Sequence, residues 1–164
     1  MIKSPIQKIV PFLWYATQAE EAARFYASVF PDSRVDSVTA MNADSPSGPA
    51  GSVKVVNFTL FGQKFMAMTA GPHQEFNDAI SFMVNCASQA EVDRYWDAIL
   101  ENGGKEQACG WIIDKWGVRW QITPTVLNEM MSSADRTKAR RVAEEMMKQI
   151  KFDIAALKRA YDGG

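Results

Sequence analysis

Hydrophobic and polar positions follow the same order in two stretches of the chain. Residues 9–20 read IVPFLWYATQAE and residues 80–91 read ISFMVNCASQAE, an offset of 71 residues. In each copy a short apolar run of strand length ends at Thr17 or Ser88. These hydroxyls can accept the free N–H groups of a helix's first turn, and a glutamate follows three residues later. The pattern predicts a strand and then a capped helix in both copies.

Each predicted helix has one apolar stripe. The helices span residues 19–30 and 89–102, and they stop at Pro31 and at Gly103 with Gly104. Apolar positions at helical spacing predict one buried face for each helix. These positions are Ala22, Phe25 and Val29 in the first helix and Val92, Trp96, Ile99 and Leu100 in the second.

Strand candidates joined by turn signals follow each helix. The sequence predicts strands at residues 34–39, 53–60, 64–70, 105–108, 110–113 and 118–123. Gly62 and Gln63 form the predicted turn between strands 53–60 and 64–70. Residues 114–117 form the predicted turn between strands 110–113 and 118–123, with Gly117 in the left-handed position that closes it. A long Ser/Pro/Gly loop covers residues 41–52. The prediction is therefore a βαβββ module that occurs twice.

The remaining residues, 125–164, are predicted to be helical. Apolar residues recur three or four positions apart, and Lys, Arg and Glu occupy the opposite side of the predicted helix. Asp153 is a candidate N-cap for a second short helix. The apolar stripe consists of Val142, Met146, Ile150, Ile154, Leu157 and Tyr161. Such a stripe needs a partner surface, either the two sheets or another subunit.

Composition narrows the class of protein. The 164 residues are 47% hydrophobic and 23% charged, with a formal charge of -1 and a pI near 5.9. These values are typical of a globular protein and argue against nucleic acid as a partner. Cys86 and Cys109 lack CxxC spacing, no signal-peptide pattern opens the chain, and no apolar run reaches the roughly 20 residues that span a membrane. We expect a reduced, cytoplasmic protein with no membrane partner.

Two modules of this kind resemble the vicinal oxygen chelate superfamily, which includes glyoxalase I, extradiol dioxygenases and bleomycin-resistance proteins. The resemblance to its PhnB-like branch covers nearly the whole chain. It is carried by the segments PFLW (11–14), QAEEA (18–22), FNDAISF (76–82), CGW (109–111), DKWG (114–117) and WQI (120–122).

The resemblance implies an α+β fold with paired βαβββ modules and a C-terminal helical tail. It implies one domain over residues 1–124, with modules at about 5–71 and 79–124, followed by a helical extension at 125–164. Superfamily members commonly build their cavity by pairing modules within or between chains. Module pairing between chains, together with the apolar stripe of the tail, implies a homodimer.

The resemblance also implies a metal site with His and Glu ligands, sometimes Gln, from the first and last strands of each module. Strand alternation points Ser81, Met83 and Asn85 into the cavity, and the repeat carries this parity back to Phe12 and Trp14. None of these side chains is a histidine or a carboxylate. Gln121 alone occupies the position of the superfamily's glutamate, and one amide cannot hold a divalent metal. We expect neither metal nor cofactor.

The candidate ligand-binding residues are Trp14, Ser81, Met83, Trp111 and Gln121. Trp14 and Trp111 could equally be core, and Trp120 is assigned to the helix side of its sheet. Gln121 either contacts a ligand or satisfies its amide on the backbone or on Ser81.

No catalytic residue is predicted. His73 is interpreted as a solvated loop residue and Cys109 as an inert, half-buried thiol.

Two function hypotheses follow. The first is a metal-independent protein that binds a small apolar or aromatic molecule in an aromatic-lined cavity. The alternative is an enzyme of the same superfamily, of lyase or dioxygenase type, or the 3-demethylubiquinone-9 3-methyltransferase activity with which this branch is often labelled. The absent His and Glu ligands count against the first kind of enzyme. The absence of a glycine-rich turn for S-adenosylmethionine counts against the second.

Overall fold

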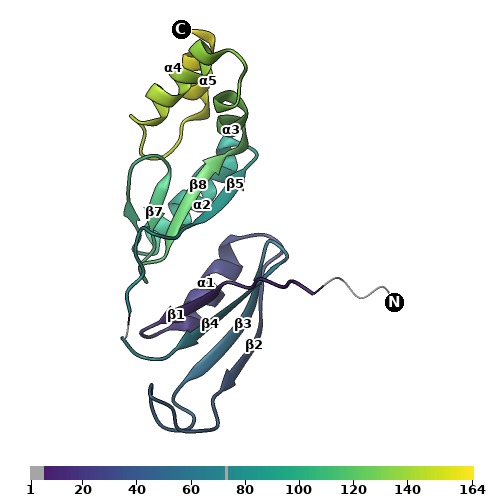
Figure 1. The fold of residues 1–164 in the computed structure, drawn as a ribbon, viewed down its shortest axis with the longest axis vertical. Helices are drawn as coiled ribbons and strands as arrows, with labels where there is room; N and C mark the ends of the chain where they lie inside the picture. Colours follow the sequence, from purple (N-terminus) through teal and green to yellow (C-terminus); the bar gives the residue numbers. More distant parts are fainter. Residues whose placement is uncertain (1–5, 73) are drawn as a thin grey trace, which may run out of the picture. The chain divides into compact units, whose positions relative to one another are not determined.

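The structure is a computed structural model that describes residues 6–72 and 74–164. Contacts within the chain divide it into two compact units. The first unit ends at Glu75, and the second runs from Phe76 to Gly164. Figure 1 labels most of the helices and strands of both units, and each unit is described by itself below.

The first unit is a four-stranded sheet covered on one face by a helix. The strand order is β1-β4-β3-β2, with β1 parallel to β4 and the other neighbours antiparallel. Its elements are β1 (Phe12–Tyr15), α1 (Ala19–Val29), β2 (Arg34–Ala40), β3 (Lys54–Leu60) and β4 (Gln63–Thr69).

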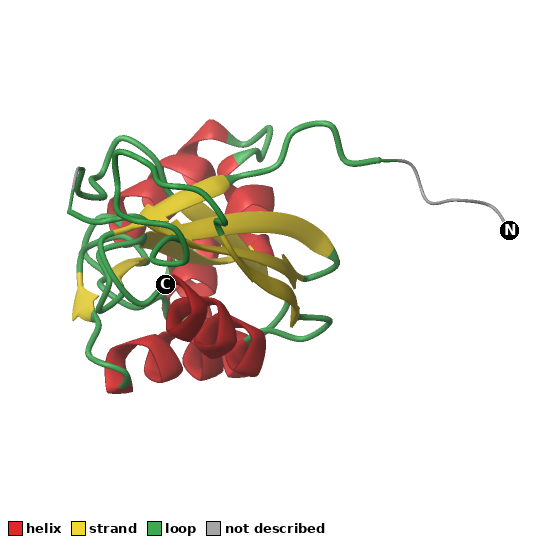
Figure 2. Ribbon diagram, turned by 90° about the horizontal axis from the view of Figure 1, so that it is seen from below, coloured by secondary structure: helices red, strands yellow, loops and turns green. Residues whose placement is uncertain are grey.

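The second unit repeats this plan and adds three helices. Its strand order is β5-β8-β7-β6, with β5 parallel to β8. The elements are β5 (Phe82–Cys86), α2 (Gln89–Glu101), β6 (Lys105–Glu106), β7 (Trp111–Ile113), β8 (Arg119–Pro124), α3 (Thr125–Met131), α4 (Arg136–Met146) and α5 (Ile154–Asp162). The predicted α+β fold with two βαβββ modules and a helical tail is confirmed. Figure 2 shows the helices and strands by class.

The core of the first unit lies between α1 and its sheet. Tyr26 is 1% exposed, its ring lies 6.5 Å from that of Phe58, and its hydroxyl lies 3.0 Å from the hydroxyl of Tyr15. The predicted stripe assigned this place to Phe25, which is only half-buried. The prediction was wrong by one position, because two buried hydroxyls that pair with each other make tyrosine suitable for the core.

The core of the second unit follows the predicted stripe of α2. Val92, Trp96 and Ile99 are at most 1% exposed, and the Trp96 indole N–H donates to Glu106. Leu100 is 36% exposed, at the margin of this face. Ile80 lies before β5, which begins only at Phe82, and is 67% exposed.

The two predicted helix caps differ. Ser88 caps α2: its hydroxyl accepts the Glu91 N–H, and the Glu91 carboxylate accepts the Ala87 N–H. Thr17 does not cap α1. The N-cap is Gln18, in the left-handed conformation, and the Ala19 N–H donates instead to the Thr69 hydroxyl of β4. The start of α1 is therefore satisfied by a side chain from another strand, whereas the start of α2 is satisfied by side chains close in the sequence.

The C-terminal helices pack on one another and within their own unit. Asp135 and Asp153 accept N–H groups at the starts of α4 and α5, so the predicted role of Asp153 is confirmed. Val142 and Leu157 are fully buried where α4 meets α5. Ile150 is 50% exposed, because the apolar stripe is interrupted between these two helices.

No helix within residues 6–72 and 74–164 combines the length and the apolarity that a membrane span requires.

The contrast between the caps generates a prediction. Ser88→Ala should lower the free energy of unfolding by about 1 kcal/mol, because the Glu91 N–H in the first turn of α2 loses its side-chain acceptor. Thr17→Ala should change it by less than about 0.5 kcal/mol, since no N–H of α1 depends on that side chain. Denaturant unfolding of both variants measures the difference, and equal losses would contradict the assignment.

Candidate functional site

The face of the second sheet opposite α2 carries a row of three candidate residues. Strand register places Met83 of β5 beside Gln121 of β8, and Gln121 beside Trp111 of β7. Met83 is 49% exposed, while Gln121 and Trp111 are half-buried. The intervening residues Val84, Ile112 and Ile122 are buried under the helix. We call the side that carries Met83, Gln121 and Trp111 the open face.

Gln121 is held by the fourth candidate of this unit. Its amide N–H donates to the Ser81 hydroxyl at 2.7 Å, across the parallel β5–β8 pair. Ser81 and Gln121 are 40 residues apart in the sequence, so only the closure of the sheet brings them together. This hydrogen bond fixes the amide plane and leaves one end of the amide directed away from Ser81.

Two of the three tryptophans around the β7–β8 turn have structural roles. The buried Asp114 carboxylate accepts the N–H groups of Trp116 and Val118, and its other oxygen accepts the Trp120 indole N–H at 3.0 Å. Trp120 is 2% exposed and contacts Phe82, so its predicted place on the helix side is confirmed. The Lys115 ammonium lies 4.6 Å from the centre of the Trp116 ring. Trp111, by contrast, lies in the row on the open face.

Arg119 is a residue of this region that the sequence analysis missed. It lies two positions before Gln121, so alternation puts it on the same side of β8. Its side chain is 15% exposed, and the guanidinium donates to the Asp78 carboxylate at 2.8 Å and to the carbonyls of Phe76 and Gly117. The signal available in the sequence was the parity shared with Gln121. Arg119 ties the first residues of the unit to its last strand.

Trp14 lies in the first unit, on a corresponding face. Trp14 pairs with Met68 in the β1–β4 register, and Phe12 pairs with Met66. Phe12 is 48% exposed and Trp14 is 38% exposed, so the parity that the repeat predicted for β1 is confirmed. The Trp14 indole N–H donates to the Gly71 carbonyl at 3.2 Å.

The donor set on these faces does not fit the metal site that the superfamily resemblance implies. By register, Met66 is the counterpart of Gln121, and Phe12 is the counterpart of Met83. Thioethers, rings and one amide replace the imidazoles and carboxylates that bind divalent metals. Within the described ranges, no group of three or more His, Cys, Asp or Glu lies close enough to hold a metal ion.

The two cysteines and the single histidine are the other side chains that could take part in catalysis. Burial raises the pKa of the Cys86 thiol to about 12, with a further contribution from the negative charge of Glu91. Cys86 is therefore a neutral core residue at physiological pH. Cys109 is half-buried, in a turn with a left-handed backbone. His73 lies outside the described residues.

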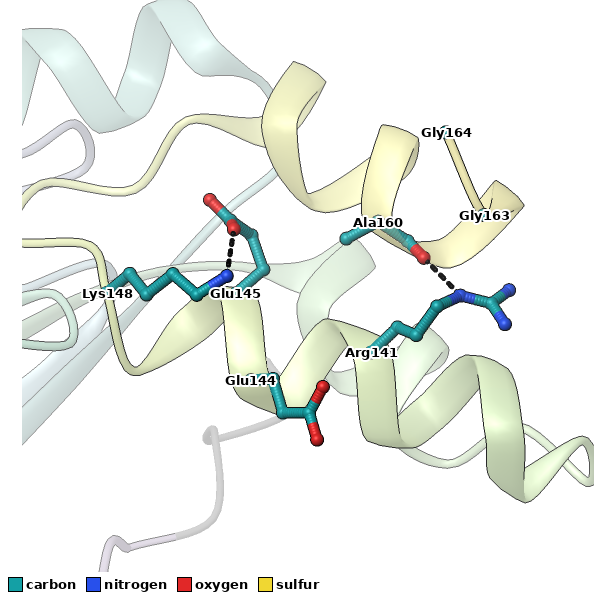
Figure 3. Close-up of a pocket in the computed structure, with 7 residues that line it drawn as sticks. All are labelled: Arg141, Glu144, Glu145, Lys148, Ala160, Gly163 and Gly164. Carbon is teal, nitrogen blue, oxygen red and sulfur yellow. Dashed lines mark hydrogen bonds and ion pairs between the residues drawn. The ribbon is translucent and has the colours of Figure 1, made fainter.

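A polar pocket of about 290 Å³ lies between α4 and α5 (Figure 3). Arg141 donates from there to the carbonyls of Ala160 and Tyr161, where it caps the end of α5, and Lys148 pairs with Glu145. The lining residues are Arg141, Glu144, Glu145, Lys148, Ala160, Gly163 and Gly164. None of the predicted site residues lines this pocket, and Glu144 pairs with Arg140, which lies outside the lining.

Comparison with known families identifies the fold. The model of the 3-demethylubiquinone-9 3-methyltransferase family matches residues 7–123. The chain belongs to this family. A PhnB protein from Bacillus cereus, to which that methyltransferase activity is assigned provisionally, is 32% identical. The match covers 73% of this chain and 100% of that one, with a TM-score of 0.63.

Other solved structures extend the family's fold to the wider superfamily. The PA1353 protein from Pseudomonas aeruginosa is 25% identical over 73% of this chain and 98% of its own, with a TM-score of 0.55. The fosfomycin resistance protein FosX from Mesorhizobium loti is 15% identical over 81% of this chain and 100% of its own, with a TM-score of 0.55, and shows the fold alone. PhnB and FosX are vicinal oxygen chelate proteins, so the predicted superfamily is confirmed. No curated protein matches the chain.

The Asp114 arrangement generates a prediction. Asp114→Ala removes the acceptor for two backbone N–H groups and one indole, and should lower the free energy of unfolding by about 3 kcal/mol or more. Asp114→Asn keeps one oxygen as an acceptor for the backbone N–H groups, but its NH2 group would face the Trp120 indole N–H, donor against donor. The free energy of unfolding of this variant should therefore fall by an intermediate amount. Urea unfolding followed by tryptophan fluorescence tests this order, and a fully stable Asp114→Ala variant would show that the carboxylate does not organise the turn.

Proposed function

We propose that this protein binds a small apolar or aromatic molecule on the open face of its second sheet. The observation that carries the proposal is the row of Met83, Gln121 and Trp111, with Ser81 holding the amide of Gln121. A sulfur, an indole and one oriented amide provide apolar contact area together with a single polar anchor. Such a surface suits a flat organic molecule that has one hydrogen-bonding group.

The amide of Gln121 is suited to the polar contact. Within the part of the chain that the structure describes, its only side-chain hydrogen bond is the one to Ser81. The opposite end of the amide therefore has hydrogen-bonding capacity that a ligand can use. Because the hydrogen bond to Ser81 holds the amide plane, the opposite end is already oriented, which reduces the entropy lost on binding.

We propose that binding needs no metal. The equivalent positions of the first and last strands carry Phe12, Met66, Met83 and Gln121, a set without a histidine or a carboxylate. A Mn(II) complex is known for the FosX protein from Listeria monocytogenes, which shares only 16% sequence identity with this chain. At this level of identity the complex describes that protein and is no evidence for a metal in this chain.

The methyltransferase activity in the family's name finds little support in this chain. Its strand-to-helix connections, at residues 16–18 and 87–88, contain no glycine. A methyl donor of nucleotide type is usually cradled by a glycine-rich turn at this place in a fold. The binding function is therefore favoured over methyl transfer.

We further propose that the protein is a homodimer in the cytoplasm. Phe12 and Met83 are both about half exposed on the faces of their sheets, and exposed apolar side chains can be covered by a second copy of the chain. Native mass spectrometry of the purified protein reports the subunit number, any metal and any retained organic molecule in one spectrum. A dimer with an organic adduct supports the proposal, whereas a stoichiometric divalent ion would overturn the metal-independent mechanism.

A variant tests the site itself. Gln121→Ala should weaken binding of the retained adduct, or of anilinonaphthalene sulfonate as an aromatic probe, by about fivefold, the loss expected for one hydrogen bond of about 1 kcal/mol. The fold should persist, because Gln121 is only half-buried. Fluorescence titration measures the affinity, and circular dichroism confirms the fold.

The matched control is Gln63→Ala, which removes the same amide from an exposed position of the first unit. Its affinity for the probe should equal that of the unaltered protein. Equal affinities for all three proteins would show that Gln121 does not contact the ligand.

A further inference from the structure

The C-terminal extension lies outside the part of the chain that the family shares. The family match ends at residue 123, and the whole Bacillus cereus relative corresponds to 73% of this chain. The segment between α4 and α5 nevertheless contacts two other parts of its own unit, the turn that precedes β7 and helix α2. We call residues 149–153 of this segment, an irregular stretch that is part of neither sheet, the docking strand.

The turn before β7 has an unfavourable backbone. Cys109 and Gly110 are both left-handed, with φ of 59° and 76°. A left-handed conformation is costly for a residue with a Cβ, so Cys109 needs support from its surroundings. The docking strand supplies it: the Cys109 N–H donates to the Gln149 carbonyl and the Gly110 N–H to the Ile150 carbonyl, both at 2.8 Å.

Phe152 fills the space beside this turn. A Cβ at Gly110 would overlap the ring of Phe152, so the ring packs where any other side chain would stand. Phe152 is 2% exposed, although the apolar stripe of the tail did not include it. Glycine at position 110 therefore serves two needs at once, the positive φ and the close approach of a ring.

The docking strand is itself anchored to α2. The Gln89 side chain donates to the Phe152 carbonyl and accepts the Ile154 N–H, both at 2.9 Å. The Lys151 ammonium lies 3.0 Å from Asp93 and 3.2 Å from Asp97. The Gln89 amide and Lys151 hold the pKa of Asp93 below its usual value. This depressed pKa contributes stability above the ordinary aspartate pKa, which is lost as pH falls through the lower folded value.

The supported turn leads directly into the open face. The Gly110 carbonyl accepts the N–H of Ile122, the residue after Gln121, and the Trp111 N–H donates to the Ala108 carbonyl. The backbone of Trp111 is thus set by a turn whose conformation depends on the docking strand. We infer that Phe152 and the docking strand are positioning elements for Trp111, although they lie outside the family's shared fold.

The experiment follows the Trp111 indole with or without a ligand. The protein is labelled with fluorotryptophan, and Trp111→Phe and Trp14→Phe assign two of the fluorine resonances. Phe152→Ala should shift or broaden the Trp111 resonance and leave the Trp14 resonance of the first unit unchanged. Phe152→Leu, which keeps much of the apolar volume, should produce a smaller change in the same direction. Met147→Ala is the control, because Met147 is 63% exposed on the same stretch of chain.

The part of this inference that concerns ligand binding rests on the proposed function. Phe152→Ala should also reduce the affinity for anilinonaphthalene sulfonate severalfold, because an indole that is no longer held loses contact area. An unmoved Trp111 resonance in folded Phe152→Ala, or in folded Phe152→Leu if the alanine variant does not fold, would overturn the positioning role. A shifted resonance in a protein that binds no probe would uphold the positioning role and refute the proposed binding function.

Discussion

Each sheet depends on the parallel pairing of its first and last strands. β1 lies beside β4 and β5 beside β8, so the chain returns to its starting edge after a helix and two further strands. This closure pairs residues that are 54 positions apart in the first sheet and 38 apart in the second, and it determines which side chains share a face. The hydrogen bond from Gln121 to Ser81 is a direct product of the β5–β8 register. Without this parallel pair, the row on the open face would not exist.

Most of the fold was predictable because it is encoded by local periodicity that occurs twice. Alignment of the two repeats at an offset of 71 residues predicted that Phe12 lies on the same face of its sheet as Met83 does, and both residues are about half exposed. Alternation likewise separated Trp120 from Gln121 correctly. These are properties of short stretches of sequence, in which period two and period 3.6 are sufficient signals.

Three of the failures share a physical cause: partners elsewhere in the sequence. Thr17 and Ser88 have the same local signal, but the Thr69 hydroxyl of another strand accepts the first N–H of α1. Tyr26 replaced Phe25 in the core because the Tyr15 hydroxyl is available to it. Phe152 falls outside the helical stripe of the tail, and its place is set by Gly110, which lies 42 positions earlier in the sequence. Single-sequence reasoning has no access to such pairings.

The two units differ in how much of the chain each needs, and this bears on synthesis at the ribosome. The hydrogen bonds described for the first unit join residues that all precede Glu75, so its sheet has every partner once those residues have emerged. The turn at Cys109 and Gly110 must instead wait for the carbonyls of Gln149 and Ile150. Domains generally fold in the order in which they are made. All strands of the second module are therefore synthesised before the partners of its left-handed turn, which come only with Gln149 and Ile150.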